Sequence, residues 1–301
     1  MLETNKLVRK LSIGNDKLLP LTDEHIQNIQ TILLEMMGDF DTFCQENGLR
    51  YFLCSGTALG AVRHGGFIPW DEDVDIAMPR EDYDQLAGLF TAQYGDRYWL
   101  QNLDSGNGYN LAFTKIRKKG TRYIEIFDTA PEQAGIFVDV YPLENTPDFP
   151  LWRWAHGVVS DFLHLCCSCV RAKFYQPVYH TYFDDKAALK TVRFKAFLGT
   201  CLSFFSLERW CRLTNRWAAC CKNTQSRYVT FPCGRKHYFG EMFPRQALYP
   251  LQRVAFAGRQ FSMMHDPAAH LTVLYGDYTV IPPKNEQERH AILELDLGES
   301  V

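Results

Sequence analysis

Two carboxylates separated by one apolar residue, in Asp73-Val74-Asp75, are the first feature of this 301-residue chain that could do chemistry. With Ile76 they form a β-strand pattern, in which successive side chains point to opposite faces. Asp73 and Asp75 would share one face, while Val74 and Ile76 enter the core. A cation between two carboxylates relieves their repulsion, and Mg²⁺ prefers carboxylate oxygens combined with substrate phosphates. The pattern therefore indicates a metal site, although an exposed edge strand has the same spacing.

Two further motifs support a site for metal and phosphate. Asp139 stands inside the apolar run Ile136–Tyr141, where a lone carboxylate is costly unless it is paired or metal-bound. Gly56 and Thr57 follow a short apolar run and begin a predicted helix, where backbone N–H groups and a hydroxyl can hold a phosphate. The motifs occur in the order small-residue turn, Asp-x-Asp strand and later Asp strand.

This order resembles the nucleotidyltransferase superfold typified by DNA polymerase beta. More narrowly, the chain resembles the LicD family, which includes fukutin and fukutin-related protein. The resemblance spans roughly residues 24–290, and matches are sparse within 151–250. It is carried by the stretches 56–64, 66–76, 79–83, 113–117, 135–143 and 274–278, and by Pro282-Pro283.

The resemblance implies transfer of a phospho-substituent, often phosphocholine, from a CDP-linked donor such as CDP-choline to a glycan hydroxyl. The acceptor would be a cell-surface glycan or its lipid-linked precursor, as in lipopolysaccharide or teichoic acid biosynthesis. The family's metal carboxylates correspond to Asp73, Asp75 and Asp139, which are the expected catalytic and metal-binding residues for Mg²⁺, with Mn²⁺ as an alternative. The family's phosphate site corresponds to Gly56 and Thr57.

Several neighbouring residues are candidates for supporting roles. Lys115 and Arg117 share one strand face and are expected to clamp the donor phosphates, unless they are a solvated pair. Arg63 and His64 follow the phosphate turn and are expected to contact the donor, although His64 could equally be structural. Asp71 shares the face of Asp73 and is expected beside the metal site rather than in it.

The expected mechanism is an in-line displacement in which the acceptor hydroxyl attacks phosphorus and the nucleotide leaves as a phosphate anion. One or two metal ions would neutralise both oxygens, and Asp139 would accept the hydroxyl proton. A true nucleotidyltransferase that releases pyrophosphate would use the same carboxylates. A non-catalytic glycan-binding module is a third reading, which the three intact carboxylates disfavour.

The elements that must position these residues can be read from apolar spacing. Residues 22–47 have a helical apolar stripe, with Thr22 as cap and Asn47-Gly48 as stop. Strand patterns follow at 51–54, 73–78, 111–116, 123–127 and 136–141, with a helix after Pro79. We predict one α+β domain over 1–301, with a mixed-sheet nucleotidyltransferase-type core at 22–145. A mainly helical extension at 146–301, with a strand pattern near 254–263, would form the acceptor side.

Charge is distributed unevenly along the chain. Residues 1–150 contain 13 Lys and Arg against 23 Asp and Glu, whereas 171–236 contain 13 bases and three acids. The basic segment lacks a recognised nucleic-acid motif, and the acidic first half would repel such a polymer. We therefore expect it to contact an anionic membrane or a lipid-linked glycan. The residues that motivate this are Arg193, Lys195, Arg209, Arg212 and Arg216, beside Phe194, Phe197, Phe204, Phe205, Trp210 and Trp217.

The remaining signals exclude other classes of protein. The ten cysteines are clustered, as in Cys166-Cys167-Ser168-Cys169, which favours buried thiols over a disulfide framework or a zinc site. There is no P-loop, dinucleotide or nucleophile-elbow motif. Without a signal peptide or a long apolar run, the chain is expected to be cytoplasmic, with the inner face of the membrane as an alternative location.

Overall fold

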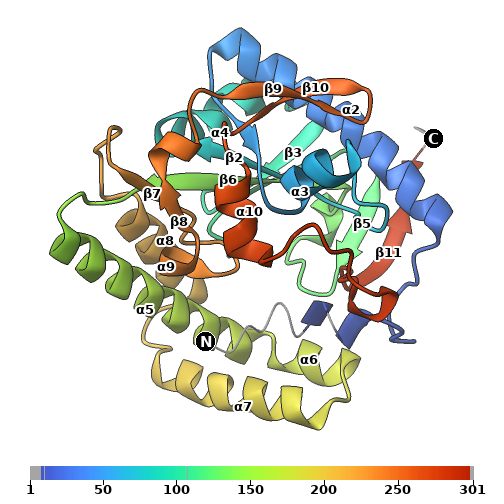
Figure 1. Ribbon diagram of the computed structural model, residues 1–301. Helices are drawn as coiled ribbons and strands as arrows, with labels where there is room; N and C mark the ends of the chain where they lie inside the picture. The colour runs from blue at the N-terminus through green and yellow to red at the C-terminus, as the bar shows by residue number, and fades with distance from the viewer. Residues whose placement is uncertain (1–7, 10, 107, 299–301) are drawn as a thin grey trace.

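A nine-stranded mixed sheet organises the computed structural model, which describes residues 8–9, 11–106 and 108–298 (Figure 1). Seven of its strands follow the order β3-β4-β6-β2-β1-β10-β9. They are β1 (Phe52–Leu53), β2 (Val74–Pro79), β3 (Tyr98–Gln101), β4 (Thr114–Lys118), β6 (Phe137–Asn145), β9 (Gln252–Phe256) and β10 (Arg259–Met263). Beyond this path, β7 (Tyr228–Thr230) pairs with the end of β6, and β8 (Met242–Pro244) pairs with β7.

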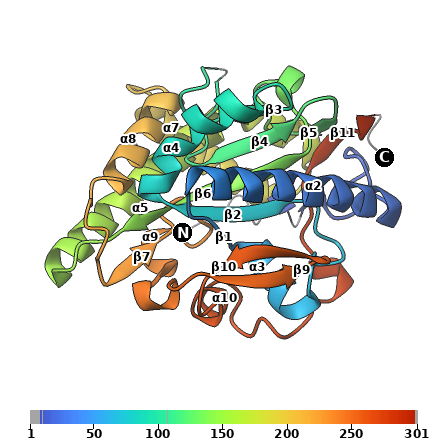
Figure 2. The ribbon, with the colours of Figure 1, turned by 90° about the horizontal axis from the view of Figure 1, so that it is seen from above.

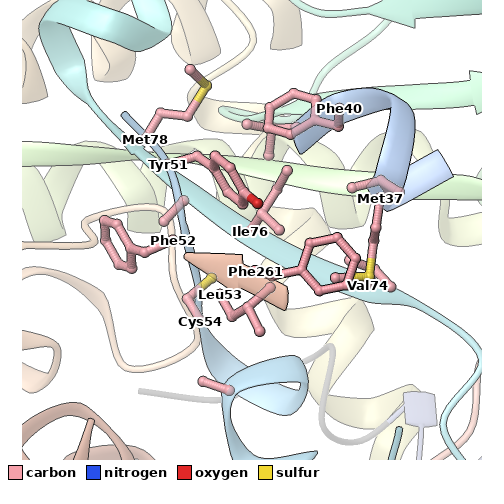
Figure 3. Packing of buried hydrophobic residues seen from close by; sticks show 14 of the residues in the cluster. Met37, Phe40, Tyr51, Phe52, Leu53, Cys54, Val74, Ile76, Met78 and Phe261 are labelled. Atoms are coloured by element: carbon pink, nitrogen blue, oxygen red, sulfur yellow. The ribbon is translucent and has the colours of Figure 1, made fainter. Parts of the chain in front are cut away.

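One face of the sheet is covered by α2 (Asp23–Asn47) and α4 (Arg80–Tyr94), which lie across the same side of β2 and β6 (Figure 2). Helix α2 begins where the sequence predicts, since the Thr22 hydroxyl caps it, and Gly48 ends it in a left-handed conformation. Its apolar stripe packs with Val74 and Ile76 of β2, and Figure 3 shows Met37 and Phe40 among these side chains. The alternate side chains of β2 therefore face away from α2.

The parallel pairing of β2 with β6 fixes the position of the carboxylates. Its register places Val74 beside Val138 and Asp75 beside Asp139. The apolar members are fully buried in the core with α2, so a shift of β2 by one residue would turn Asp73 and Asp75 into the core instead. Burial of the valines thus determines which face carries the acids.

A layer of helices lies beyond the other face of the sheet. It consists of α5 (Pro150–Phe174), α6 (Gln176–Tyr182), α7 (Lys186–Cys201) and α8 (Leu207–Ala218) (Figure 1). Helix α5 contacts α6, α7, α8 and the short α9 (His237–Gly240). Cys166, Cys167 and Cys169 are buried in this layer, as the sequence predicts.

The predicted α+β class with a mixed sheet is confirmed by these elements. The helix α3 (Ser55–His64) follows β1, and α10 (Ala268–Tyr275) packs against it. The pair β5 (Arg122–Glu125) and β11 (Ile292–Asp296) forms a separate small sheet. The division at residue 145 remains a prediction; strands β9 and β10, from the second part, extend the main sheet. None of the helices in the described ranges has the length and apolar composition to cross a bilayer.

Candidate active site

A row of three charged side chains crosses the centre of the sheet. Lys115 of β4 is paired with Asp139 of β6, which is paired in turn with Asp75 of β2. Residues in register on adjacent strands project to the same face, so the three side chains lie next to one another. Lys115 and Asp139 are almost fully buried, and Lys115 Nζ lies 3.2 Å from Asp139 Oδ1. The two aspartates are brought together as the sequence analysis requires.

The electrostatics of this row disfavour two ionised carboxylates without a cation between them. Burial, together with Asp73 and Asp139, raises the pKa of Asp75 to about 8. Burial also raises the pKa of Asp139, and because Lys115 opposes this the value is only about 6. Lys115 is thus the counter-ion of Asp139, whereas Asp75 has a backbone donor, Gly56 N–H, at 3.4 Å.

Asp73 lies at the start of the same strand but has different partners. Its Oδ2 is 2.9 Å from His290 Nε2 and 3.7 Å from an Arg9 nitrogen. His290 Nδ1 is 2.8 Å from Glu125 Oε1, so the imidazole bridges two carboxylates. Burial and Arg9 lower the pKa of His290, but the carboxylates Asp73 and Glu125 outweigh them and raise it to about 10.

Arg9, Glu125 and His290 also belong to this site, although no sequence motif indicated them. They come from the N-terminal segment, the end of β5 and the segment before β11. No local pattern marks them, because an isolated charged residue gives no periodic signal. The alternating strand around Glu125 could have indicated that its side chain shares a face with Tyr123.

Gly56 and Thr57 lie in the first turn of α3, directly against β2. The backbone N–H of Asp75 donates to Thr57 Oγ1 at 2.8 Å, so this buried hydroxyl attaches α3 to the strand. A Cβ at Gly56 would lie 2.9 Å from Asp71 Oδ2, so a larger residue there would force Asp71 to shift. The structure therefore places both residues beside the carboxylates, and phosphate binding by them stays a prediction.

Arg117 and Lys115 share a face of β4, as the spacing predicts, but Arg117 is fully engaged inside the protein. Its Nε donates to Gln101 Oε1 at 2.8 Å, and its terminal nitrogens bind Asp128 and the Gly135 carbonyl. Only 1% of Arg117 is exposed. A direct clamp on a phosphate would require Arg117 to leave these partners, whereas Lys115 already faces the aspartate row.

The other predicted donor contacts end up in different surroundings. Arg63 donates to the carbonyl oxygens of Tyr278 and Val280 at 3.0 and 3.1 Å, and its Nε lies 3.0 Å from His64 Nε2. Arg63 and His64 do not line the cavity at the carboxylates. Their contact with the CDP-linked donor stays a prediction, and their position outside the cavity does not favour it. Asp71 does lie beside the site, because a Cβ built at Gly56 would be 2.9 Å from Asp71 Oδ2 and 3.7 Å from Asp75 Oδ2.

A cavity of about 380 Å³ opens in front of Asp75 and Asp139. It extends from the sheet to α5, α7 and α8, so its walls combine the core with the helical layer. Its lining includes the carboxylates Asp75, Asp139 and Glu125 from the sheets, and the bases Arg171 and Lys195 from the helical layer. Such a cavity can hold a ligand with both an anionic part and a neutral or cationic part.

Two of the three predicted metal carboxylates are placed to bind a hard divalent cation, and the third is not. Asp75 and Asp139 offer adjacent oxygens, and buried Asp139 Oδ1 accepts no hydrogen bond of good geometry among the described residues. Asp73 is already bound to His290. Across the described residues, no group of three or more His, Cys, Asp or Glu side chains is arranged to hold a metal. Mg²⁺ commonly takes one or two carboxylates and completes its shell with water and substrate phosphates, so the Asp75–Asp139 pair could hold one ion without Asp73.

Comparison with known proteins shows that the part of the chain that carries these residues matches a protein family. Residues 48–155, which contain Gly56, Asp75, Lys115 and Asp139, match the family model LicD/FKTN/FKRP, nucleotidyltransferase domain. This region of the chain is similar to the LicD family. The resemblance recognised in the sequence is thereby confirmed, and the carboxylate row lies within the matched LicD region.

The proteins similar to this chain differ in how much of it they cover. Lipopolysaccharide cholinephosphotransferase LicD of Haemophilus influenzae is 25% identical over 282 residues, which are 88% of this chain and 95% of that protein. An uncharacterized protein of Rickettsia typhi is 46% identical over 140 residues, 43% of this chain and 41% of its own. Ribitol 5-phosphate transferase FKRP of Homo sapiens is 48% identical over 48 residues, 16% of this chain and 10% of that enzyme.

Proposed function

We propose that the chain is a metal-dependent phosphotransferase that moves phosphocholine, or a similar phospho-substituent, from a CDP-linked donor to a glycan hydroxyl. The observation that carries this proposal is the Asp75–Asp139 pair, in register with Lys115 at the edge of a cavity. Support comes from the LicD family, whose members here include a lipopolysaccharide cholinephosphotransferase and a ribitol 5-phosphate transferase. The acceptor would be a cell-surface glycan or its lipid-linked precursor.

Asp139 is the residue best suited to accept the proton of the acceptor hydroxyl. A general base is most effective when its pKa lies near the working pH, and the pKa of Asp139 is raised to about 6 by burial, with Lys115 opposing. Lys115 Nζ also lies 3.2 Å from Glu125 Oε2, which holds the ammonium in place. Lys115 therefore orients Asp139 and keeps it ionised at neutral pH.

Asp75 and Asp139 would hold the divalent ion, with Asp73 as the predicted third carboxylate. A bound ion would neutralise the charge on the transferred phosphoryl group and on the departing nucleotide phosphate. The Gly56 N–H donates to Asp75 Oδ2 and the Asp75 N–H donates to Thr57 Oγ1, and these two hydrogen bonds keep α3 against the carboxylates. The start of this helix would therefore border the donor phosphates.

Isothermal titration with CDP-choline, CDP-ethanolamine, CDP-ribitol and CTP, each with and without Mg²⁺, tests the donor and the metal together. We expect metal-dependent binding of one CDP-linked compound, and CMP as product when an acceptor glycan is added. Asp75→Asn should abolish turnover, whereas Asp96→Asn, at an exposed position, should not. Release of pyrophosphate from CTP would identify a true nucleotidyltransferase instead, and full activity of the Asp75 variant would refute the metal role.

A further inference from the structure

Helix α7 presents two faces of different chemistry. Its inner face consists of Ala188, Val192, Lys195, Ala196 and Gly199, which are buried. Its opposite face, called here the α7 outer face, is exposed to solvent and consists of Lys186, Lys190, Arg193, Phe194, Phe197 and Cys201. At 100° per residue these six positions fall within about a third of the helix circumference.

The α7 outer face is purely basic and carries exposed aromatic rings. The helix contains no Asp or Glu. Among the residues that the structure describes, Lys186, Lys190 and Arg193 take part in none of the ion pairs. Phe194 and Phe197 are 57% and 66% exposed. Charge and apolar area therefore coincide on one surface that faces away from the protein.

The structure changes which members of the basic segment can meet a partner. Lys195 and Trp210, which the sequence analysis counted with the contact surface, are buried, so that part of the expectation is wrong. Lys195 Nζ lies 2.9 Å from Ser168 Oγ, inside the helical layer. Arg212 is paired with Asp104 and Glu208. On α7, the basic residues that remain exposed are Lys186, Lys190 and Arg193. They lie on the outer face together with the two phenylalanines.

We propose that the α7 outer face docks on an anionic lipid bilayer. In that position Phe194 and Phe197 would enter the boundary between headgroups and acyl chains, while the basic side chains meet lipid phosphates. A second copy of this chain is a poor alternative in a symmetric contact, because Lys186, Lys190 and Arg193 would face the same cations. Single aromatic residues are common on surfaces, but a basic helix face with adjacent rings matches the interfacial type.

The position of α7 relates this surface to the cavity. Helix α7 is the outermost helix of the layer in Figure 1 and packs against α5 and α6. Arg171 of α5 and Lys195 of α7 line the cavity that Asp75 and Asp139 also line. A bilayer on the α7 outer face would thus be one helix away from the cavity. This inference rests on the proposed function in one respect, because it names the surface at which the enzyme would meet a lipid-linked acceptor. Binding to the bilayer does not itself depend on the transfer reaction.

Co-sedimentation with lipid vesicles tests the proposal on the full chain. We expect binding to phosphatidylcholine vesicles that contain phosphatidylserine or phosphatidylglycerol, weak binding to phosphatidylcholine alone, and loss of binding when salt rises from about 50 mM to about 500 mM. Each neutralised base should weaken partitioning about fivefold, so Lys186→Gln/Lys190→Gln/Arg193→Gln should weaken it about a hundredfold. Phe194→Ser/Phe197→Ser should weaken it about tenfold or more at constant charge.

The matched control is Arg209→Gln/Arg216→Gln/Lys222→Gln, which removes the same charge from exposed positions outside the α7 outer face. Its binding should stay within about threefold of the parent, since distant charges are screened. Absence of binding to anionic vesicles at low salt, or equal losses in both triple variants, would overturn the proposal. Retention by single-stranded RNA or an acidic protein, but not by vesicles, would overturn it as well. Transfer to a soluble acceptor should be unchanged in the α7 variants, so failure here is distinct from failure of the proposed reaction.

Discussion

Asp75→Asn should make the metal-free protein more stable while it destroys activity. Asparagine has nearly the same shape as aspartate but carries no charge, so the packing around α3 and β2 is preserved. The carboxylate of Asp75 is half-buried, and its ionised form is destabilised by lost solvation and by the neighbouring charges of Asp73 and Asp139. Removing its charge removes this unfavourable contribution to the free energy of folding.

The magnitude follows from linkage between protonation and folding. The pKa of Asp75 rises from its ordinary 3.8 to about 8. A carboxyl whose pKa is raised on folding costs nothing below pH 3.8, and its cost grows until the pH reaches about 8. At pH 7 the cost approaches about 4 kcal/mol, and relaxation around the site would leave about 2 kcal/mol or more. The melting temperature should therefore rise by several degrees, at about 2 °C per kcal/mol for a protein of this size.

Urea and thermal unfolding in EDTA, at pH 5 and pH 7, measure this effect. The stability advantage of Asp75→Asn should be larger at the higher pH. Millimolar Mg²⁺ should stabilise the parent protein and have little effect on the variant, since a ligand that binds only the folded state shifts unfolding. Asp96→Asn, at an exposed position, should change stability by less than about 0.5 kcal/mol. A variant that is less stable than the parent in EDTA would refute the argument from charge repulsion.

Three further predictions concern the surroundings of the carboxylates. Lys115→Met leaves Asp139 without its counter-ion, so we expect a loss of about 3–5 kcal/mol in urea unfolding and about a hundredfold lower turnover in a transfer assay. Gly56→Ala places a methyl group 2.9 Å from Asp71 Oδ2, so we expect about 1–3 kcal/mol of destabilisation by the same unfolding assay and reduced donor binding by calorimetry. His270 is buried, which lowers its pKa from 6.5 to about 4; stability should fall by up to about 3 kcal/mol as the pH drops through this window, and His270→Gln should flatten that dependence in urea titrations.

Each of these predictions has a matched control. Lys17→Met breaks an exposed ion pair with Asp184 and should cost no more than about 1 kcal/mol. Gly88→Ala introduces a methyl group into open space within α4 and should be neutral or slightly stabilising. His265→Gln changes an exposed histidine and should leave the acid dependence intact. Equal effects in a variant and its control would contradict the structural explanation in each case.

Local geometry made much of the site predictable. The two-residue period of a strand puts Asp73 and Asp75 on one face and Val74 and Ile76 on the other, whatever the strand pairs with. The apolar stripe and the Thr22 cap of α2 are equally local, and they appear in the structure where the sequence indicates them. The family resemblance added the expectation that Asp139 belongs to the same site.

Pairing over long sequence distances was decided by the tertiary structure alone. The register of β2 against β6, and of β6 against β4, aligns Asp75, Asp139 and Lys115, and no periodic signal encodes it. It depends on the burial of Val74 and Val138 under α2, which is a property of the assembled core.

The same reason explains the residues that the sequence could not assign. His290 reaches Asp73 from more than 200 positions away, and Lys195 turns into the helical layer while Arg193 faces solvent. The charge and periodicity of a segment show which of its residues could be buried. Which of them are buried depends on the elements that pack against the segment. The sequence by itself therefore determined the chemistry of the carboxylates and the faces of their strands. The tertiary structure decided which counter-ions they meet and which bases remain on the surface.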